Sequence, residues 1–288
     1  MKRFSHPFMH LLVLAMWSLA LMVLAVIIGM VAGISEERVA DSPTTFLLWN
    51  IIVQLMTFAF PVLIVTRIYY HDSPLFSFRF PSLTSWKYVL AGVVVMLLLV
   101  PLTDWLGVWN DSWHFSGAWE KLEHGLRSAG EQSQQMVDTL MRECHPLLSL
   151  LGMALIPALC EELFFRAGVQ NLLRCWFKNP HAAVWVTAAV FSLAHGEVFA
   201  FLPRFLLGAL LGYLYLYGRS LWVNVTAHFV NNAIIVLAYV LMTGEDSQFD
   251  PSQSLAVPVV ATVACTLAAA ALFWFAFLRN KNQEKKVL

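Results

Sequence analysis

Long, nearly uncharged apolar runs recur along the whole chain of 288 residues. A helix needs about 20 predominantly apolar residues to cross the roughly 30 Å hydrocarbon core of a bilayer. Hydropathy averaged over windows of about 19 residues predicts eight such spans. They lie at Leu11–Val31, Phe46–Thr66, Tyr88–Leu106, Leu147–Gln170, His181–Phe199, Phe201–Tyr217, Leu221–Met242 and Ala256–Leu278. The expected fold is therefore an all-α polytopic membrane protein with about eight transmembrane helices.

Charged residues are scarce, and their signs are unevenly distributed. Only 12% of the residues are charged, and 18 basic residues balance 18 acidic ones. This balance gives a nucleic-acid partner no support, because the phosphate backbone favours a basic surplus. Twelve of the 18 basic residues fall at the termini and in alternate connections, whereas residues 111–146 on the other side are rich in acidic residues. The positive-inside rule therefore predicts a multi-pass protein with both termini in the cytoplasm. From the compactness of the chain and its charge asymmetry we expect the cell (inner) membrane, with a eukaryotic endomembrane as the alternative.

Two segments allow more than one interpretation. The first apolar run follows Lys2 and Arg3, as in a signal peptide, but it is longer than the about 7–15 apolar residues of such a peptide. We therefore expect an uncleaved membrane helix. Residues 111–146 form the one long polar connection. An interfacial amphipathic helix that covers the core is one interpretation, but the apolar periodicity is weak, and we expect a mainly solvated extracytoplasmic segment with one helix.

Three of the predicted spans carry polar residues at membrane depth. Charged groups are costly there, so those that persist are candidates for function. The fourth, fifth and seventh spans contribute Glu161, Glu162, Arg166, His195, His228 and Asn232. At a rise of about 1.5 Å per residue, the groups lie at similar middle depths, so they could meet.

The spacing within the fourth span separates the roles of its two glutamates. Glu162 and Arg166 are four residues apart, the spacing at which a carboxylate and a guanidinium pair on one helix. Glu161 is then left without a local partner. A purely structural interpretation, in which both glutamates only hold helices together through Arg166, does not account for the histidines and the asparagine at similar depth.

The residue types suit hydrolysis by an activated water. A buried carboxylate can act as a general base, and a histidine can orient the water or share its proton. A second histidine and an asparagine amide can donate to a developing oxyanion. Glu161, His195 and His228 could instead hold a divalent metal such as zinc, although no HExxH spacing is present. We therefore predict no specific cofactor, and a divalent metal at these three residues stays an alternative.

Three short motifs resemble those of a known family. The runs Glu161-Glu162-x-x-x-Arg166, Phe191-x-x-x-His195 and His228-x-x-x-Asn232 resemble, in order and spacing, the motifs of the CAAX prenyl protease type II and bacteriocin-processing (CPBP, or Abi) family. The resemblance implies an intramembrane glutamate-dependent endopeptidase with an all-helical fold. It further implies that Glu161 activates water with His195, that His228 and Asn232 form the oxyanion site, and that Glu162 and Arg166 support them.

The predicted spans divide the chain into four parts, and the resemblance covers the third of them. We expect three transmembrane helices in residues 1–110, the polar segment in 111–146, the CPBP-like catalytic core in 147–242, and the last helix with a basic cytoplasmic tail in 243–288. The expected partners are the lipid bilayer and a membrane-associated peptide or protein substrate. Two alternatives use the same buried residues: a transporter or proton-coupled carrier, and a catalytically inactive membrane scaffold of the same fold.

Overall fold

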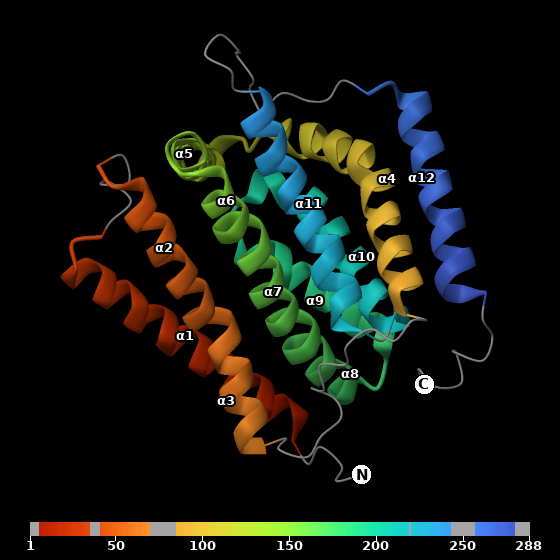
Figure 1. Cartoon of the computed structure of the whole chain (residues 1–288), viewed down its shortest axis with the longest axis horizontal. Coiled ribbons are helices and arrows are strands. Elements are labelled where there is room, and N and C mark those ends of the chain that lie inside the picture. The colour runs from red at the N-terminus through yellow and green to blue at the C-terminus, as the bar shows by residue number, and fades with distance from the viewer. Residues whose placement is uncertain (1–5, 35–40, 70–84, 219, 243–256, 280–288) are drawn as a thin grey trace.

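The computed structural model describes residues 6–34, 41–69, 85–218, 220–242 and 257–279. Within these ranges the chain forms helices and no strand, so the all-α prediction is confirmed. Seven of the described helical segments are long and apolar enough to cross a membrane. The protein is therefore an all-α polytopic membrane protein, and the remaining predicted span is a shorter apolar helix (Figure 1).

The N-terminal helices form one flank of the molecule. Helix α1 (Pro7–Val31) packs against a 27-residue segment in which a π-helical turn at Leu55–Ala59 joins α2 (Pro43–Gln54) to α3 (Phe60–Tyr69). Pro43 begins α2 at a position where its missing N–H is not needed. The outer face of α1 is apolar and exposed, with Val31 at 86%, as expected of a surface that faces lipid.

One interrupted helix runs through the middle of the bundle (Figure 1). It comprises α6 (Pro146–Ser149), a π-helical stretch (Leu150–Leu155), α7 (Ile156–Glu162), a second π-helical stretch (Leu163–Gln170) and α8 (Asn171–Phe177). More than half of its apolar window is buried, whereas only 11% of that of α1 is. This enclosed segment carries the acidic pair identified in the sequence.

The C-terminal helices form the other flank. Helix α11 (Leu221–Met242) packs against α6 and α7 on one side and against α4 (Ser85–Asp111) on the other. Helix α4 also contacts α10 (Phe201–Gly218) and α12 (Val259–Phe273), which a π-helical turn extends to Leu278. The polar residues of α11 are thus enclosed on both sides.

Helix α9 (Pro180–Ala194) is shorter than predicted. The expected end of the fifth span at Phe199 is wrong, because Gly196 adopts a φ of +72°, which favours glycine and terminates the helix. The chain then makes a 3₁₀ turn at Val198–Ala200 and continues into α10. This early end places His195 at the C-terminal cap of α9 rather than inside a span.

Helices α9 and α10 approach each other closely at two glycines. A Cβ on Gly208 would lie 3.1 Å from the Cα of Ala188, and one on Gly212 would lie 2.8 Å from a methyl carbon of Val184. Small residues at such positions allow helices in membranes to pack by close contact. The crossing fixes the position of α9 and of the histidine at its end.

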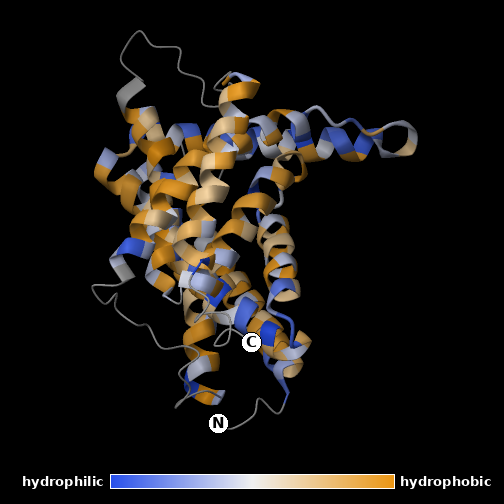
Figure 2. Cartoon of the chain, turned by 90° about the vertical axis from the view of Figure 1, so that its right-hand side faces the viewer, coloured by the Kyte–Doolittle hydropathy of each residue, from blue (hydrophilic) through white to orange (hydrophobic). Residues whose placement is uncertain are grey.

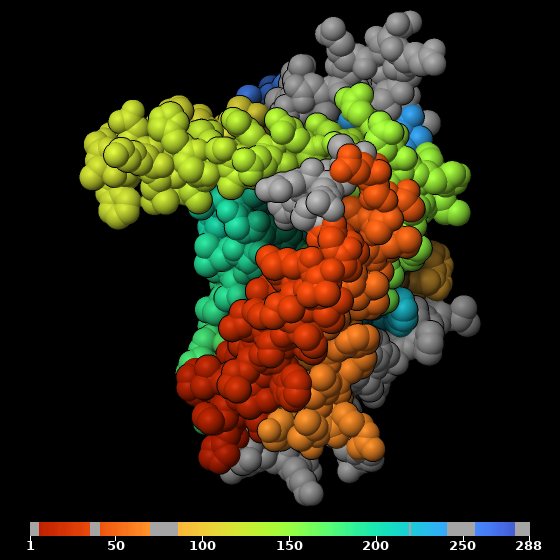
Figure 3. Space-filling model, turned by 90° about the vertical axis from the view of Figure 1, so that its left-hand side faces the viewer, coloured from red at the N-terminus to blue at the C-terminus, as the bar shows by residue number. Residues whose placement is uncertain are grey.

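Residues 111–146 contain a long helix, α5 (Glu120–Glu143), which lies across one end of the bundle and projects beyond it (Figures 2 and 3). Near its C-terminal end, Met136 and Leu140 pack with Phe46 and Leu47 of α2. Our preference for a mainly solvated segment is therefore wrong for this half of the helix. The expectation of a weak apolar periodicity is wrong as well, because the apolar residues of α5 lie on one face of the helix.

Candidate active site

The acidic pair lies where the central helix changes its pitch. Helix α7 ends at Glu162, and π-helical stretches precede and follow it. Such wide turns inside α-helices frequently occur at functional sites. Neighbouring residues on a helix point about 100° apart, so Glu161 and Glu162 face different surroundings from the same turn.

Glu162 is the centre of a fully buried ionic group. Its Oε2 accepts a hydrogen bond of 2.9 Å from Nε of Arg166, and both side chains have no exposed surface. Its Oε1 lies 3.0 Å from Nδ1 of His228 and 3.4 Å from an Nη of Arg166. The predicted pairing of Glu162 with Arg166 is thus present, and it extends across helices to α11.

Glu161 has fewer partners than its neighbour. It is buried, and its Oε2 lies 3.9 Å from Nε2 of His228. Within the part of the chain that the structure describes, this oxygen makes no hydrogen bond. An under-coordinated carboxylate oxygen is an acceptor that can take a proton or bind a water molecule. His228 therefore lies between the two glutamates, with one ring nitrogen facing each.

The tautomer of neutral His195 follows from its backbone contact. Its Nδ1 lies 2.8 Å from the carbonyl oxygen of Phe191, one helical turn earlier. A carbonyl oxygen only accepts hydrogen bonds, so Nδ1 carries the hydrogen and donates it. The Nε2 of the neutral ring therefore has a free lone pair. Such a nitrogen can accept a hydrogen bond from a water molecule.

A cavity of about 470 Å³ brings three of the four predicted catalytic residues together. Glu161, His195 and Asn232 line it, whereas His228 lies behind Glu161 and does not. The Oδ1 of Asn232 accepts a hydrogen bond of 3.2 Å from Nδ2 of Asn231. This contact leaves the Nδ2 of Asn232 as the donor for other groups. Glu162 and Arg166 also lie outside the lining.

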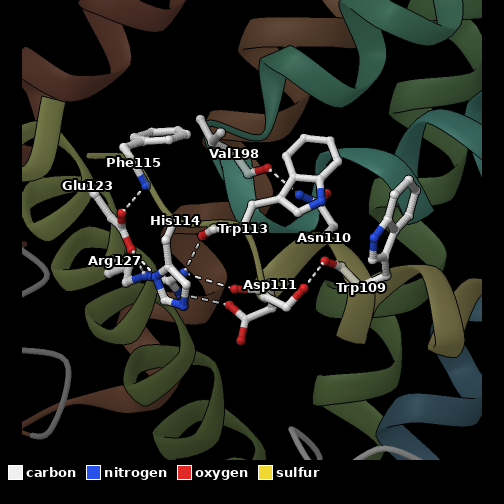
Figure 4. A network of polar contacts seen from close by, with 10 residues as sticks. Trp109, Asn110, Asp111, Trp113, His114, Phe115, Glu123, Arg127 and Val198 are labelled. Carbon is white, nitrogen blue, oxygen red and sulfur yellow. Dashed lines mark hydrogen bonds and ion pairs between the residues drawn. The ribbon is translucent and has the colours of Figure 1, made fainter. Parts of the chain in front are cut away.

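The loop after His195 is held by residues from α4 and α5 (Figure 4). The fully buried Asn110 donates to the carbonyl oxygen of Val198 and accepts from the backbone N–H of Leu202, at 3.2 and 2.7 Å. The guanidinium of Arg127 lies 3.9 Å above the ring of Phe199. These contacts join segments about 90 residues apart and hold the loop in place.

Arg127 is in turn anchored by Glu123 and Asp111. Its Nε donates to Glu123 and one Nη to Asp111, each at 2.9 Å. The backbone N–H of Phe115 and the ring of His114 also contact Glu123. The hydrogen bond from Arg127 and the further contacts lower the pKa of Glu123 to about 2.

The N-terminal half also contributes polar residues to the cavity that were not predicted from the sequence. Asn50 and Gln54 of α2 and Gln134 of α5 line it as well. Asn50 and Gln54 stand four residues apart within the apolar run Phe46–Thr66, and that spacing was the available signal. Gln134 has no comparable signal, because α5 is polar throughout much of its length.

The residues suggested as an alternative metal site do not form one. Among the described residues, no group of three or more His, Cys, Asp or Glu side chains is placed to hold a metal ion. Glu161 and His195 line the cavity, whereas His228 does not, so the three side chains do not line one common space.

Comparison with known proteins identifies the domain that contains these residues. Residues 143–234 match the family model described as Rce1-like: Type II CAAX prenyl endopeptidase Rce1-like. No curated protein and no solved structure matches the chain. The matched range contains all six candidate residues, from Glu161 to Asn232. Residues 143–234 are therefore similar to the Rce1-like family, and the predicted resemblance is confirmed for this part of the chain.

Proposed function

We propose that this protein is an intramembrane endopeptidase that hydrolyses a peptide bond in a membrane-associated or lipidated substrate through a water activated by Glu161. The observation that carries the proposal is the convergence on one cavity of Glu161, His195 and Asn232, all three of which lie in the range that matches the Rce1-like family. The cavity volume of about 470 Å³ lies in the range of ligand pockets, which runs from about 300 to 1,000 Å³.

In the proposed reaction, Glu161 removes a proton from water while the water oxygen attacks the peptide carbonyl carbon. His195 orients the same water through the lone pair on Nε2, because Phe191 holds the other ring nitrogen as a donor. The C–N bond then breaks, and Glu161 returns the proton to the leaving nitrogen. The products are a carboxylic acid and an amine, and Glu161 is regenerated.

The negative charge on the carbonyl oxygen needs a hydrogen-bond donor during this step. Asn232 lines the cavity, and Asn231 occupies its acceptor oxygen, so its amide group is available to donate. We assign His228 to the same oxyanion site; because its Nδ1 already donates to Glu162, this role requires a ring that carries a hydrogen on Nε2 as well. Arg166 neutralises Glu162 and so keeps the second carboxylate out of the reaction.

The test is to replace Glu161 by Gln, which keeps the size of the side chain and removes the base. We expect at least a 100-fold loss of cleavage, since general base catalysis contributes about 10²–10⁴-fold. A proteomic comparison of cells with either form will then find an uncleaved membrane peptide that accumulates only with Glu161→Gln. The control is Glu131→Gln on the exposed part of α5, which leaves the cavity unchanged.

Normal processing by Glu161→Gln refutes the proposal. A carrier that used the same residues would instead show Glu161-dependent uptake in proteoliposomes and no peptide products. A scaffold would retain its cellular activity when Glu161, His195, His228 and Asn232 are each replaced.

A further inference from the structure

Helix α2 presents two carboxamides to the active-site cavity. Asn50 and Gln54 both line it, and Nε2 of Gln54 donates to Oδ1 of Asn50 over 3.4 Å. The Oε1 of Gln54 is buried and has no hydrogen-bond partner among the described residues. A buried acceptor without a donor costs free energy. A residue of this kind inside a membrane helix points to a ligand that supplies the donor.

The backbone around Gln54 is also irregular. The π-helical turn Leu55–Ala59 begins at the next residue, so α2 changes pitch directly after Gln54. A similar irregularity flanks Glu161 on the central helix. The cavity therefore lies between two helices that each carry a polar group beside a π-helical turn, a feature that is frequent at functional sites.

The rest of the cavity wall is mostly apolar and rich in methionine. Its apolar residues come from α2, α5, the central helix and α11, and they are Leu47, Met136, Val137, Leu140, Met141, Met153, Pro157, Ile235 and Val236. Methionine side chains are flexible and polarizable, so a surface of this kind adapts to large apolar groups of different shapes. Among the residues that the structure describes, Glu161 is the only Asp, Glu, Lys or Arg that lines the cavity.

A peptide bound in such a cavity brings its own polar groups with it. In a helix its N–H and C=O groups pair internally, but an extended segment must find partners for them in the protein. A carboxamide is neutral and both donates and accepts, so it complements a peptide unit without adding a charge. Asn50 and Gln54 can therefore pair with the main chain of an extended substrate, while the methionine-rich wall receives its side chains.

We propose that Asn50 and Gln54 form a main-chain binding site for an extended apolar peptide, with the oxygen of Gln54 accepting a substrate N–H next to the scissile bond. The substrate class is thus a peptide segment with large apolar side chains, bound through its backbone and with little dependence on its exact sequence. This inference rests on the proposed peptidase function.

The experiment uses the full chain in nanodiscs and a pool of synthetic quenched-fluorescent decapeptides with randomised apolar centres. Matched pools carry an N-methyl group at one defined backbone position each. For the wild type, methylation of the nitrogen that pairs with Gln54 lowers kcat/KM about tenfold, the value of one well-placed hydrogen bond. Gln54→Leu lowers kcat/KM for the unmethylated pool by a similar factor and no longer responds to methylation at that position.

The control is Thr57→Val, which removes a buried hydroxyl from the same segment at a position outside the cavity. It keeps the wild-type response to N-methylation. If Gln54→Leu retains the wild-type response at every position, the assignment to α2 is refuted while Glu161-dependent cleavage still stands. If the wild type cleaves none of the pools while processing in cells still depends on Glu161, the binding of an extended apolar peptide is refuted and the peptidase stands.

Discussion

Replacing Arg166 by Met gives the sharpest test of how the acidic pair is held. Methionine keeps much of the length of arginine but removes the charge. The variant leaves Glu162 fully buried, with only the Nδ1 of His228 as a hydrogen-bond partner among the contacts in the structure. A single buried carboxylate without its cation is strongly unfavourable.

The expected cost follows from the contacts that are lost. Arg166 gives Glu162 a hydrogen bond of 2.9 Å and another of 3.4 Å, and neither side chain is exposed. Removal of one partner from a buried ion pair costs about 3–5 kcal/mol of unfolding free energy. Replacement of both partners is often close to neutral, so Glu162→Gln combined with Arg166→Met restores stability to within about 1–2 kcal/mol of the wild type.

Two features of the structure support a small change in the free energy of unfolding for the double variant. One terminal nitrogen of Arg166 has no hydrogen-bond partner among the described residues, so the wild-type group is not fully satisfied. Glutamine also keeps an oxygen that accepts from Nδ1 of His228. The wild-type pair thus contributes less to stability than the single variant suggests.

The assay is unfolding in mixed micelles by titration with sodium dodecyl sulfate, monitored by circular dichroism. The free energy of unfolding is measured for the wild type, both single variants and the double variant, which together form a double-mutant cycle. A loss below about 1 kcal/mol in Arg166→Met would show that the pair is screened by water, as exposed pairs are. A double variant as unstable as the single one would show that Arg166 stabilises the protein mainly through its packing against Phe191. Either result would refute the reasoning.

Three further changes test the surroundings of the site. Asn110→Leu leaves the backbone groups of the loop after His195 without partners, so hydrogen exchange there accelerates and cleavage falls about tenfold or more. Glu123 has a pKa of about 2 against an ordinary 4.5, so the stability that it contributes is complete above pH 4.5 and is lost as the pH falls toward 2. Tryptophan fluorescence measures this loss of stability at low pH, and the change in fluorescence is absent in Glu123→Gln. Gly212→Val forces a side chain against Val184 and lowers the free energy of unfolding in the same titration by about 1–3 kcal/mol. Gly130→Val is the control, because a Cβ there meets no neighbour within 4 Å.

The helical architecture was predictable because each span must by itself contain enough consecutive apolar residues to cross the membrane. Seven predicted spans correspond to long apolar helices, with ends that differ by a few residues. The prediction for span five was wrong at its C-terminal end, because Gly196 adopts a left-handed conformation and ends the helix before the apolar run is complete. The position of α5 was not predictable, since it depends on contacts with α2 and α11 that hydropathy does not encode.

The site was predictable to the extent that it is built from rare intramembrane charges. Glu161, Glu162 and Arg166 could be paired and separated from their spacing alone, and the structure contains that pairing. The contribution of α2 was missed because Asn50 and Gln54 are uncharged and lie in an otherwise apolar run. Their proximity to Glu161 results from the packing of the N-terminal flank against the central helix.

The different environments of the two adjacent glutamates follow from helix geometry. A rotation of about 100° between neighbours directs Glu162 toward Arg166 and His228 and leaves Glu161 in the cavity wall. Glu162 accepts the hydrogen bonds of Arg166 and of the Nδ1 of His228, whereas one oxygen of Glu161 has no hydrogen-bond partner among the described residues. His228 contacts both carboxylates, so any movement of the buried pair is transmitted to Glu161. The pair that stabilises the bundle therefore also sets the position of the group that we propose as the base.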